Sequence, residues 1–302
     1  MPKPQPVDLP FRRIAFLGFG LIGGSIAMAL RERAAPVHVT AWSPAGRGPR
    51  SGLDRGLVDV VAESPADGVR GADLVILAGP PLAVTGMLAD SPAAIANGLG
   101  STTVTDVAST KATLLRRAND GHVRFVGGHP MAGKELSGVE AASGNLFVGR
   151  PWVVVPGDFA SPDDVERVES LARFVGAVPV RMTAAEHDAA VAAISHVPLA
   201  VAAALVEAVA NGDPWRLGKA RQLAASGWRD TTRVAHGDPE MGAGIFATNA
   251  SEVASGLRRV RDAIDEWIAD LERDGCPDAA RFRARLEAAR NALTDSERAG
   301  RS

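Results

Sequence analysis

The sequence has little cysteine and little net charge, and each shortage excludes a class of protein. The single cysteine, Cys276, cannot form an internal disulfide or build a cysteine-rich metal cluster. A net charge of −2 gives no bulk attraction to nucleic acid or to an anionic membrane. With 46% apolar and 23% charged residues, the composition is typical of a soluble globular protein. We therefore expect a cytoplasmic protein that has no nucleic-acid partner and no metal.

Long uncharged apolar runs are also missing. Residues 1–10 are proline-rich and lack the apolar stretch of a signal peptide. The most apolar stretch, 184–210, is interrupted by Glu186, His187, Asp188, His196, Pro198 and Glu207. Because a membrane helix needs about 20 nearly uncharged residues, we predict a buried helix here and no membrane partner.

The order of the predicted elements indicates an α/β fold. Short β-branched runs alternate with helical stretches, and the predicted strands are 13–17, 37–42, 73–77, 102–106, 124–126, 152–155 and 177–182. After Met182, Ala, Leu, Arg and Glu dominate to the end. We predict a Rossmann-type, mostly parallel sheet domain over residues 11–182 and an all-helical domain over 183–302, without an added regulatory domain.

A glycine motif follows the first predicted strand and opens the first predicted helix. Its sequence is GFGLIG, residues 18–23. The three glycines permit a tight turn, close approach of a pyrophosphate and close packing of helix on strand. The helix N-terminus offers free N–H groups to the phosphates. We predict that the dinucleotide is bound by Gly18, Gly20, Leu21, Ile22 and Gly23.

The corner expected to hold the adenosine ribose has no carboxylate. An acidic residue is expected about 20 residues after the motif, but Ser43 stands there, followed by Arg47 and Arg50. Ser43 and Arg47 could receive a 2′-phosphate, which favours NADP, or the arginines are solvated loop residues. The predicted cofactor is therefore NAD or NADP.

Oxidation of an alcohol needs a group that accepts the hydroxyl proton, and a histidine with a pKa near 6.5 suits this task. His129 follows a predicted strand, at the carboxyl edge of the sheet where open α/β folds bind ligands. Its loop, 127–133, consists mostly of small residues. Ser109 follows another strand and could hydrogen-bond both the substrate hydroxyl and His129, cap a helix, or do both. We predict that these two residues are catalytic.

Five motifs occur in order along the chain: GFGLIGGS at 18–25, DVASTK at 106–111, GHPMAG at 128–133 with Ser137 and Gly138, ISHVP at 194–198 and DTTR at 230–233. Over residues 12–250 they resemble the prephenate/arogenate dehydrogenase family. The resemblance implies oxidative decarboxylation of a cyclohexadienol on the route to tyrosine. Hydride would pass to the nicotinamide while His129 takes the hydroxyl proton, and aromatisation would drive the reaction without a metal.

The resemblance also implies roles for residues in both halves. Arg233 would clamp the substrate carboxylate, because its planar fork suits such an anion. Ser195 and His196 would face the cleft, and Asp106 would lie on the cofactor side. Helical second domains of this type usually pair across a two-fold axis, so we expect a homodimer.

Some polar residues have two possible roles. His187 and His196 are nine residues apart, on opposite faces of an unbroken helix. We therefore expect only His196 to face the site and favour a structural or interface role for His187. Asp230 and Glu135 could form an ionic network with Arg233 or be surface charges.

Two departures from the family pattern affect the identity of the substrate. Leu199 stands where the family often has a second histidine, and Asp238-Pro239 is followed by Glu240 and not, shortly afterwards, by tryptophan. Lys134 would favour the keto acid prephenate over the ammonium of arogenate, or is a solvated lysine. Prephenate is our main hypothesis. The alternatives are arogenate, a 4-amino-4-deoxyprephenate of secondary metabolism, and a non-enzymatic NAD(P)-binding module.

Overall fold

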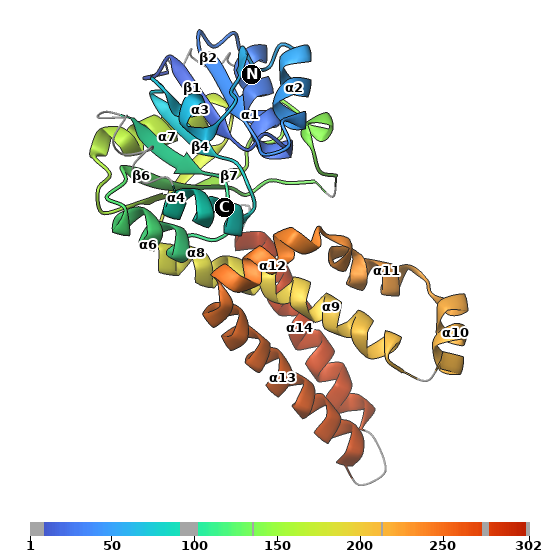
Figure 1. Cartoon of the computed structure of the whole chain (residues 1–302). Coiled ribbons are helices and arrows are strands. Elements are labelled where there is room, and N and C mark those ends of the chain that lie inside the picture. Colours follow the sequence, from blue (N-terminus) through green and yellow to red (C-terminus); the bar gives the residue numbers. More distant parts are fainter. Residues whose placement is uncertain (1–8, 91–101, 135, 213, 274–277, 300–302) are drawn as a thin grey trace. The chain divides into compact units, whose positions relative to one another are not determined.

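The computed structural model describes residues 9–90, 102–134, 136–212, 214–273 and 278–299. Its first half contains an eight-stranded sheet (Figure 1). The strands are β1 (Arg13–Leu17), β2 (His38–Trp42), β3 (Val60–Val61), β4 (Leu74–Leu77), β5 (Thr103–Asp106), β6 (Phe125–Pro130), β7 (Pro151–Pro156) and β8 (Val178–Arg181). They lie in the order β3-β2-β1-β4-β5-β6-β7-β8, and every neighbouring pair is parallel except β6 and β7. The predicted mostly parallel α/β sheet is confirmed.

Helices cover both faces of the sheet. They are α1 (Leu21–Glu32), α2 (Arg47–Asp54), α3 (Pro65–Val69), α4 (Pro81–Asp90), α6 (Ala112–Asp120) and α7 (Pro162–Phe174). In β1, Ile14 and Phe16 join an apolar cluster with α1 and α7, whereas the alternate residues Ala15 and Leu17 join a second cluster with α4 and α6. Because both faces of the sheet are covered there, β1 from Ile14 to Leu17 and β4 consist of buried apolar residues without alternating polar ones.

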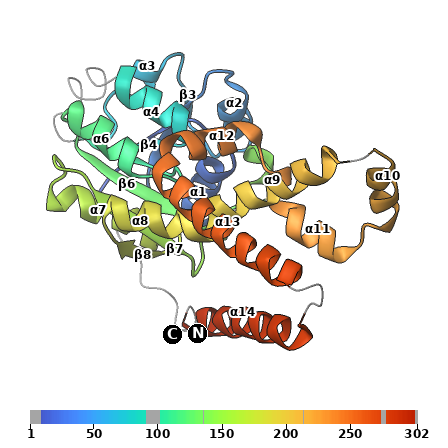
Figure 2. The same cartoon turned by 90° about the horizontal axis from the view of Figure 1, so that it is seen from below.

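The second half is helical in the part that the structure describes, as predicted. It comprises α8 (Ala184–Val191), a π-helical turn η2 (Ala192–His196), α9 (Val197–Ala210), α10 (Pro214–Leu223), α11 (Ser226–Thr232), a 3-10 turn η3 (Arg233–His236), α12 (Pro239–Thr248), α13 (Ala250–Glu272) and α14 (Ala279–Ala299). Helix α11 packs on α9, and α10 lies at the tip between them (Figures 1 and 2). Residue contacts separate the chain into two units, 1–253 and 254–302. The predicted domain boundary after residue 182 stays a prediction.

The smaller unit consists of the rest of α13 together with α14. The rings of Trp267 and Phe282 stack with 5.8 Å between their centroids, and the Arg285 guanidinium lies 4.6 Å from the Trp267 ring centre. Arg285 also donates to Asp270 at 2.9 Å. These contacts hold the two charged helices to each other.

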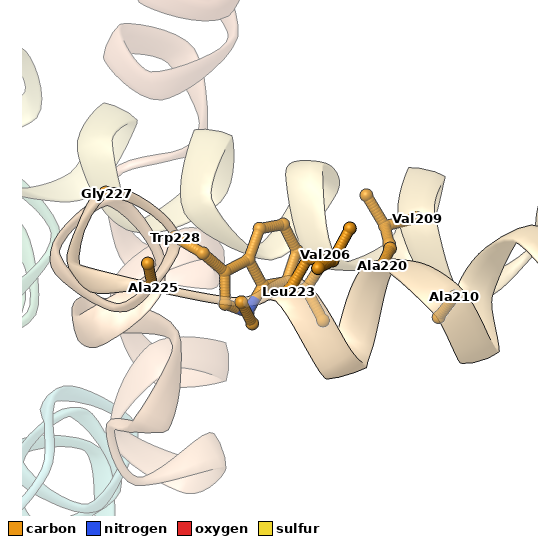
Figure 3. Close-up of a pocket in the computed structure, with 9 residues that line it drawn as sticks. Val206, Val209, Ala210, Ala220, Leu223, Ala225, Gly227 and Trp228 are labelled. Atoms are coloured by element: carbon orange, nitrogen blue, oxygen red, sulfur yellow. The ribbon is translucent and has the colours of Figure 1, made fainter.

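The apolar stretch 184–210 is less covered than predicted. By length and composition alone this 27-residue stretch could cross a membrane, and its most apolar 18-residue window has a mean hydropathy of 2.1. Only 28% of its most apolar window is buried, and Ile194 is 70% exposed, so the prediction of a buried helix is wrong for the single chain. Helix α9 is contacted by the short elements α10, α11 and η3, and only its Val197 and Ala202 are buried. A cavity of about 610 Å³ lies there, where Trp228 approaches Leu223 and Val206 (Figure 3).

Strand β6 is longer than the sequence predicts. It continues to Pro130, so His129 lies within the strand and not in a loop after it. The antiparallel partner β7 supplies the reason, because His129 pairs with Val153 and the glycines before it pair with Val154 and Val155. Glycine disfavours strands locally, so only this long-range pairing extends β6.

Candidate active site

A cavity of about 510 Å³ opens at the carboxyl ends of the central strands, where open α/β sheets bind ligands. Four strand or helix ends form its walls. They are residues 20–22 at the start of α1, 78–80 after β4, 107–109 after β5, and His129, Pro130, 132–134 and 136–138 around the end of β6. Gly237, Asp238 and Met241, around the start of α12, complete the lining. The structure therefore brings the glycine motif, Ser109, His129 and Lys134 together around one space.

The glycine motif has the shape that a dinucleotide needs. Gly18 has a φ of +93°, and a Cβ there would lie 2.4 Å from the carbonyl oxygen of Ala78, so only glycine fits. A Cβ on Gly20 would meet nothing within 4 Å, which leaves room beside the backbone. Gly20 also precedes α1 without a side-chain cap, and α1 has no acidic residue in its first turn. The open N–H groups of α1 thus suit a pyrophosphate.

The corner beside this motif is formed by the start of α2. A Cβ on Gly48 would lie 2.0 Å from the carbonyl oxygen of Phe19, so α2 packs directly on the nucleotide loop. The half-buried Ser43 lies shortly before α2, and the exposed Arg47 is the first residue of α2. The Arg50 guanidinium lies beside Gly46. The predicted hydroxyl and arginines are therefore placed next to the loop.

His129 is half-buried, and its Nδ1 lies 2.8 Å from Nε2 of His187. The two rings meet edge to face, with 5.1 Å between their centroids. Burial lowers the pKa of His129 well below 6.5, and the positive charge of Lys111 is the next cause of the decrease. The imidazole is consequently neutral at pH 7, the state in which it can accept a proton.

Ser109 lies on the same cavity with a buried hydroxyl. Among the residues that the structure describes, its Oγ has no hydrogen-bond partner, so the predicted bond to His129 is not formed. A buried hydroxyl without a partner costs about 1–3 kcal/mol. Such a group at a cavity wall indicates the place of a polar ligand atom.

Asp106 and Lys111 form a fully buried ion pair beneath the cavity. Asp106 also accepts from the backbone N–H groups of Gly128 and Ala108, each at 2.9 Å. Burial raises the pKa of Asp106, and the ammonium of Lys111 opposes that rise. Asp106 does not itself line the cavity but ties the end of β5 to β6, and its predicted contact with the cofactor stays a prediction.

The two histidines of the helical half occupy other places than predicted. His187 contacts His129 directly, and the structural or interface role expected for it stays a prediction. The helix is not unbroken, because the π turn η2 lies between the two residues and shifts the face of everything after it. Nδ1 of His196 lies 3.2 Å from Nδ2 of Asn249. Burial lowers the pKa of His196 to about 4. Neither His196 nor the exposed Ser195 lines the cavity.

Of the two cationic residues predicted to bind substrate, Lys134 lines the cavity and Arg233 does not. Lys134 is exposed on the cavity wall, and its Nζ donates to the carbonyl of Ala141 at 2.9 Å. Arg233 is the first residue of η3, is exposed and does not line the cavity, so its role stays a prediction. Asp230 is also exposed, and Glu135 lies outside the described residues. Within those residues, no group of three or more His, Cys, Asp or Glu side chains could hold a metal ion.

Sequence reasoning missed three buried residues that are bonded to one another near His187: Lys111, Asp188 and Asn249. The Asp188 carboxylate accepts from His187 and from two backbone N–H groups, while Asn249 donates to the Asp188 carbonyl at 2.9 Å. The available signal was the pair His187-Asp188 in the first two turns of a predicted helix, because a buried acid beside a histidine commonly orients its ring.

Two family models match the chain over most of its length. "Prephenate dehydrogenase, nucleotide-binding domain" matches residues 26–183, and "Prephenate dehydrogenase, dimerization domain" matches residues 183–283. The chain belongs to the prephenate dehydrogenase family. The predicted family is thereby confirmed.

Relatives of known sequence and structure agree with this membership. Prephenate dehydrogenase of Bacillus subtilis is 33% identical over 264 residues, which are 86% of this chain and 68% of that protein. Cyclohexadienyl dehydrogenase of Zymomonas mobilis is 29% identical over 87% of each chain. Prephenate dehydrogenase from Aquifex aeolicus, crystallised with hydroxyphenyl propionate and NAD+, has a TM-score of 0.83 at 26% identity, covering 94% of this chain and 99% of its own. Arogenate dehydrogenase of Synechocystis has a TM-score of 0.75 at 31% identity, over 93% and 99%.

Family and fold together make this chain an NAD(P)-dependent dehydrogenase, as predicted. The glycine motif meets the steric and electrostatic needs of the dinucleotide on its own geometry. The cofactor therefore has a place beside His129 in this member of the prephenate dehydrogenase family.

Proposed function

We propose that the chain catalyses the NAD(P)-dependent oxidative decarboxylation of prephenate to 4-hydroxyphenylpyruvate in tyrosine biosynthesis. One observation carries the proposal: a neutral histidine and an unpartnered buried hydroxyl share one cavity with an uncapped nucleotide loop. The names of the relatives support the class of substrate, since they act on prephenate, arogenate or related cyclohexadienols.

The roles of the residues follow from their atoms. Bound NAD(P)+ supplies the acceptor for a hydride. His129 accepts the proton of the ring hydroxyl at Nε2, because its Nδ1 is engaged with His187. The Ser109 hydroxyl gains its missing partner by binding the same ring hydroxyl. Loss of carbon dioxide then makes the ring aromatic, which supplies the driving force without a metal.

Charge at the far end of the substrate distinguishes the candidates. The exposed ammonium of Lys134 on the cavity wall attracts the keto-acid side chain of prephenate and repels the ammonium of arogenate. Arg233 remains the proposed clamp of the ring carboxylate. Its support is that Gly237 and Asp238, which follow it closely in the chain, line the cavity. Ser195 and His196 are proposed to act around this end of the site. Arogenate and the amino-deoxy analogue remain the second candidates.

The test is a two-by-two assay of prephenate and arogenate, each with NAD+ and NADP+, which follows the absorbance of the reduced nicotinamide. We expect turnover with prephenate at a higher kcat/KM than with arogenate. In Lys134→Met the KM for prephenate should rise, while the KM for arogenate should not. Tight dinucleotide binding with no turnover of either substrate would contradict the proposal and favour a non-enzymatic module.

We further propose a cytoplasmic homodimer that associates through the helical half. The dimerization-domain model over residues 183–283 supports it, as does the low buried share of the apolar stretch that contains α9. A membrane location is disfavoured because Asp188 and His196, inside the apolar stretch, are buried and bonded to protein groups. The two family models meet at residue 183, which supports the proposed domain boundary. Light scattering should give twice the chain mass of 31.3 kDa, and a monomeric mass would contradict the dimer.

A further inference from the structure

We infer that His187 and Asp188 are positioning residues that fix the tautomer of His129, so that the lone pair of His129 lies on Nε2. The inference rests on the proposed function of His129 as the base, because it explains how that base keeps the right nitrogen free. Nothing in the shared family motifs assigns a role to this pair.

The arrangement begins at the carboxylate of Asp188. Its Oδ1 accepts from the backbone N–H of Lys111 at 2.8 Å, and its Oδ2 accepts from the N–H of Ala112 at 2.8 Å. These donors belong to the first turn of α6, whose N-terminus favours a negative charge. Burial raises the pKa of Asp188, but the hydrogen bonds from His187, Ala112 and Lys111 outweigh it, so the net shift is downward. Asp188 is therefore an anion at neutral pH and can only accept hydrogen bonds.

The direction of the next bond follows from that charge. Nδ1 of His187 lies 2.7 Å from Oδ1 of Asp188, and since the carboxylate has no proton, Nδ1–H of His187 donates. With its proton on Nδ1, the ring of His187 presents the lone pair of Nε2 to His129. The side chain of His187 is fully buried, so no solvent competes for either nitrogen.

The last bond selects the tautomer of the base. Nδ1 of His129 lies 2.8 Å from Nε2 of His187, and because Nε2 accepts, Nδ1–H of His129 donates. The lone pair of His129 is left on Nε2, in a ring that lines the cavity. With the opposite tautomer, Nε2 of His129 would hold a proton and could not accept one from the substrate.

The same arrangement stabilises the product of proton transfer. When Nε2 of His129 takes the hydroxyl proton, the ring gains one positive charge and keeps Nδ1–H as a donor to His187. The anionic Asp188 lies one ring away, so it offsets a charge that burial and the ammonium of Lys111 oppose. The arrangement thus supplies orientation and a compensating charge without touching the substrate.

The direct test is histidine 15N NMR on the free enzyme, with the His129 signals assigned from the spectrum of His129→Asn. In the wild-type protein Nδ1 of His129 should be protonated and Nε2 unprotonated. In Asp188→Asn the amide can donate to Nδ1 of His187, which reverses both bonds and moves the His129 proton to Nε2. A wild-type His129 protonated on Nε2, or an unchanged tautomer in Asp188→Asn, would overturn the inference.

Kinetics give a second readout with a conservative rescue. Asp188→Asn and His187→Leu should lower kcat by roughly 10²–10⁴-fold with much smaller changes in KM, the range known for lost base catalysis and a wrong histidine tautomer. His187→Gln should keep kcat within roughly tenfold, because its amide N–H can donate to Asp188 while its carbonyl accepts from His129. A His187→Gln enzyme as slow as His187→Leu would refute orientation as the function of His187.

Controls separate this inference from the proposed function. Asp163→Asn changes an exposed aspartate on α7 and should leave kcat and the His129 signals unaltered. Dinucleotide affinity, measured for each variant, shows whether it is folded, and the wild-type spectrum decides the tautomer even if Asp188→Asn does not fold. If the tautomer is as stated but His129→Asn retains turnover, the proposed base is wrong while the positioning arrangement stands.

Discussion

Replacing Lys111 by methionine should destabilise the protein strongly and in a pH-dependent way. The methionine fills the space of the lysine stem but leaves the Asp106 carboxylate buried with only two backbone donors, from Gly128 and Ala108. Breaking one side of a buried ion pair typically costs about 3–5 kcal/mol, because an uncompensated charge remains.

The structure also sets a ceiling on this cost. Asp106 can escape its unpaired charge by taking a proton. From its ordinary pKa of 3.8 this costs about 4.4 kcal/mol at pH 7, at 1.36 kcal/mol per pH unit. At pH 5 the same step costs about 1.6 kcal/mol. The loss caused by Lys111→Met should therefore shrink by up to about 2.7 kcal/mol between pH 7 and pH 5.

The assay is urea unfolding of wild type and variant at both pH values, followed by tryptophan fluorescence at one protein concentration. Lys219→Met on the exposed side of α10 is the matched control and should change the free energy of unfolding by less than about 0.5 kcal/mol. Adding Asp106→Asn to Lys111→Met should recover part of the stability, because the buried charge is gone. A loss that is the same at both pH values, or no larger than that of the control, would refute the reasoning.

Four further outcomes are expected. His129→Asn should lower kcat by about 10²–10⁴-fold, and near-normal turnover in steady-state assays would contradict its role as base. Because burial lowers the pKa of His129 well below 6.5, and only the neutral ring is active, kcat/KM should stay constant as pH falls through 6.5 and decline only at lower pH. An initial-rate pH profile that declines around or above 6.5 would count against this. Arg233→Gln should raise the KM for prephenate more than it lowers kcat, and an unchanged KM would remove Arg233 from the substrate site. Gly18→Ala would place a Cβ 2.4 Å from a carbonyl oxygen, so the dinucleotide Kd should rise by roughly tenfold or more in titrations. Gly56→Ala, with a similar positive φ and open space, is its control.

The predictable parts of this molecule depend on neighbours in sequence. Gly18 and the strand before it could be assigned because a tight turn and an apolar run are local features. The extension of β6 through His129 could not, because its partner Val153 lies 24 residues later in an antiparallel strand. The contact of His187 with the base was missed because a constant 100° per residue was assumed across a segment that contains a π turn. The burial of Lys111 was hidden for a different reason, since its partner Asp106 had been assigned to the cofactor.

The π turn at Ala192–His196 gives one continuous helical segment two independent tasks. Its extra residue offsets α9 in rotation from α8, by about 100° relative to a regular helix. Helix α8 therefore directs His187 and Asp188 toward His129, while α9 presents its apolar residues in a different direction. Under the proposed dimer, substitutions along α9 could change the contact between two copies without disturbing the residues that serve the base. Deleting one residue from the π turn would rotate the whole of α9 relative to α8, so the direction of its apolar residues would change relative to His187 and Asp188.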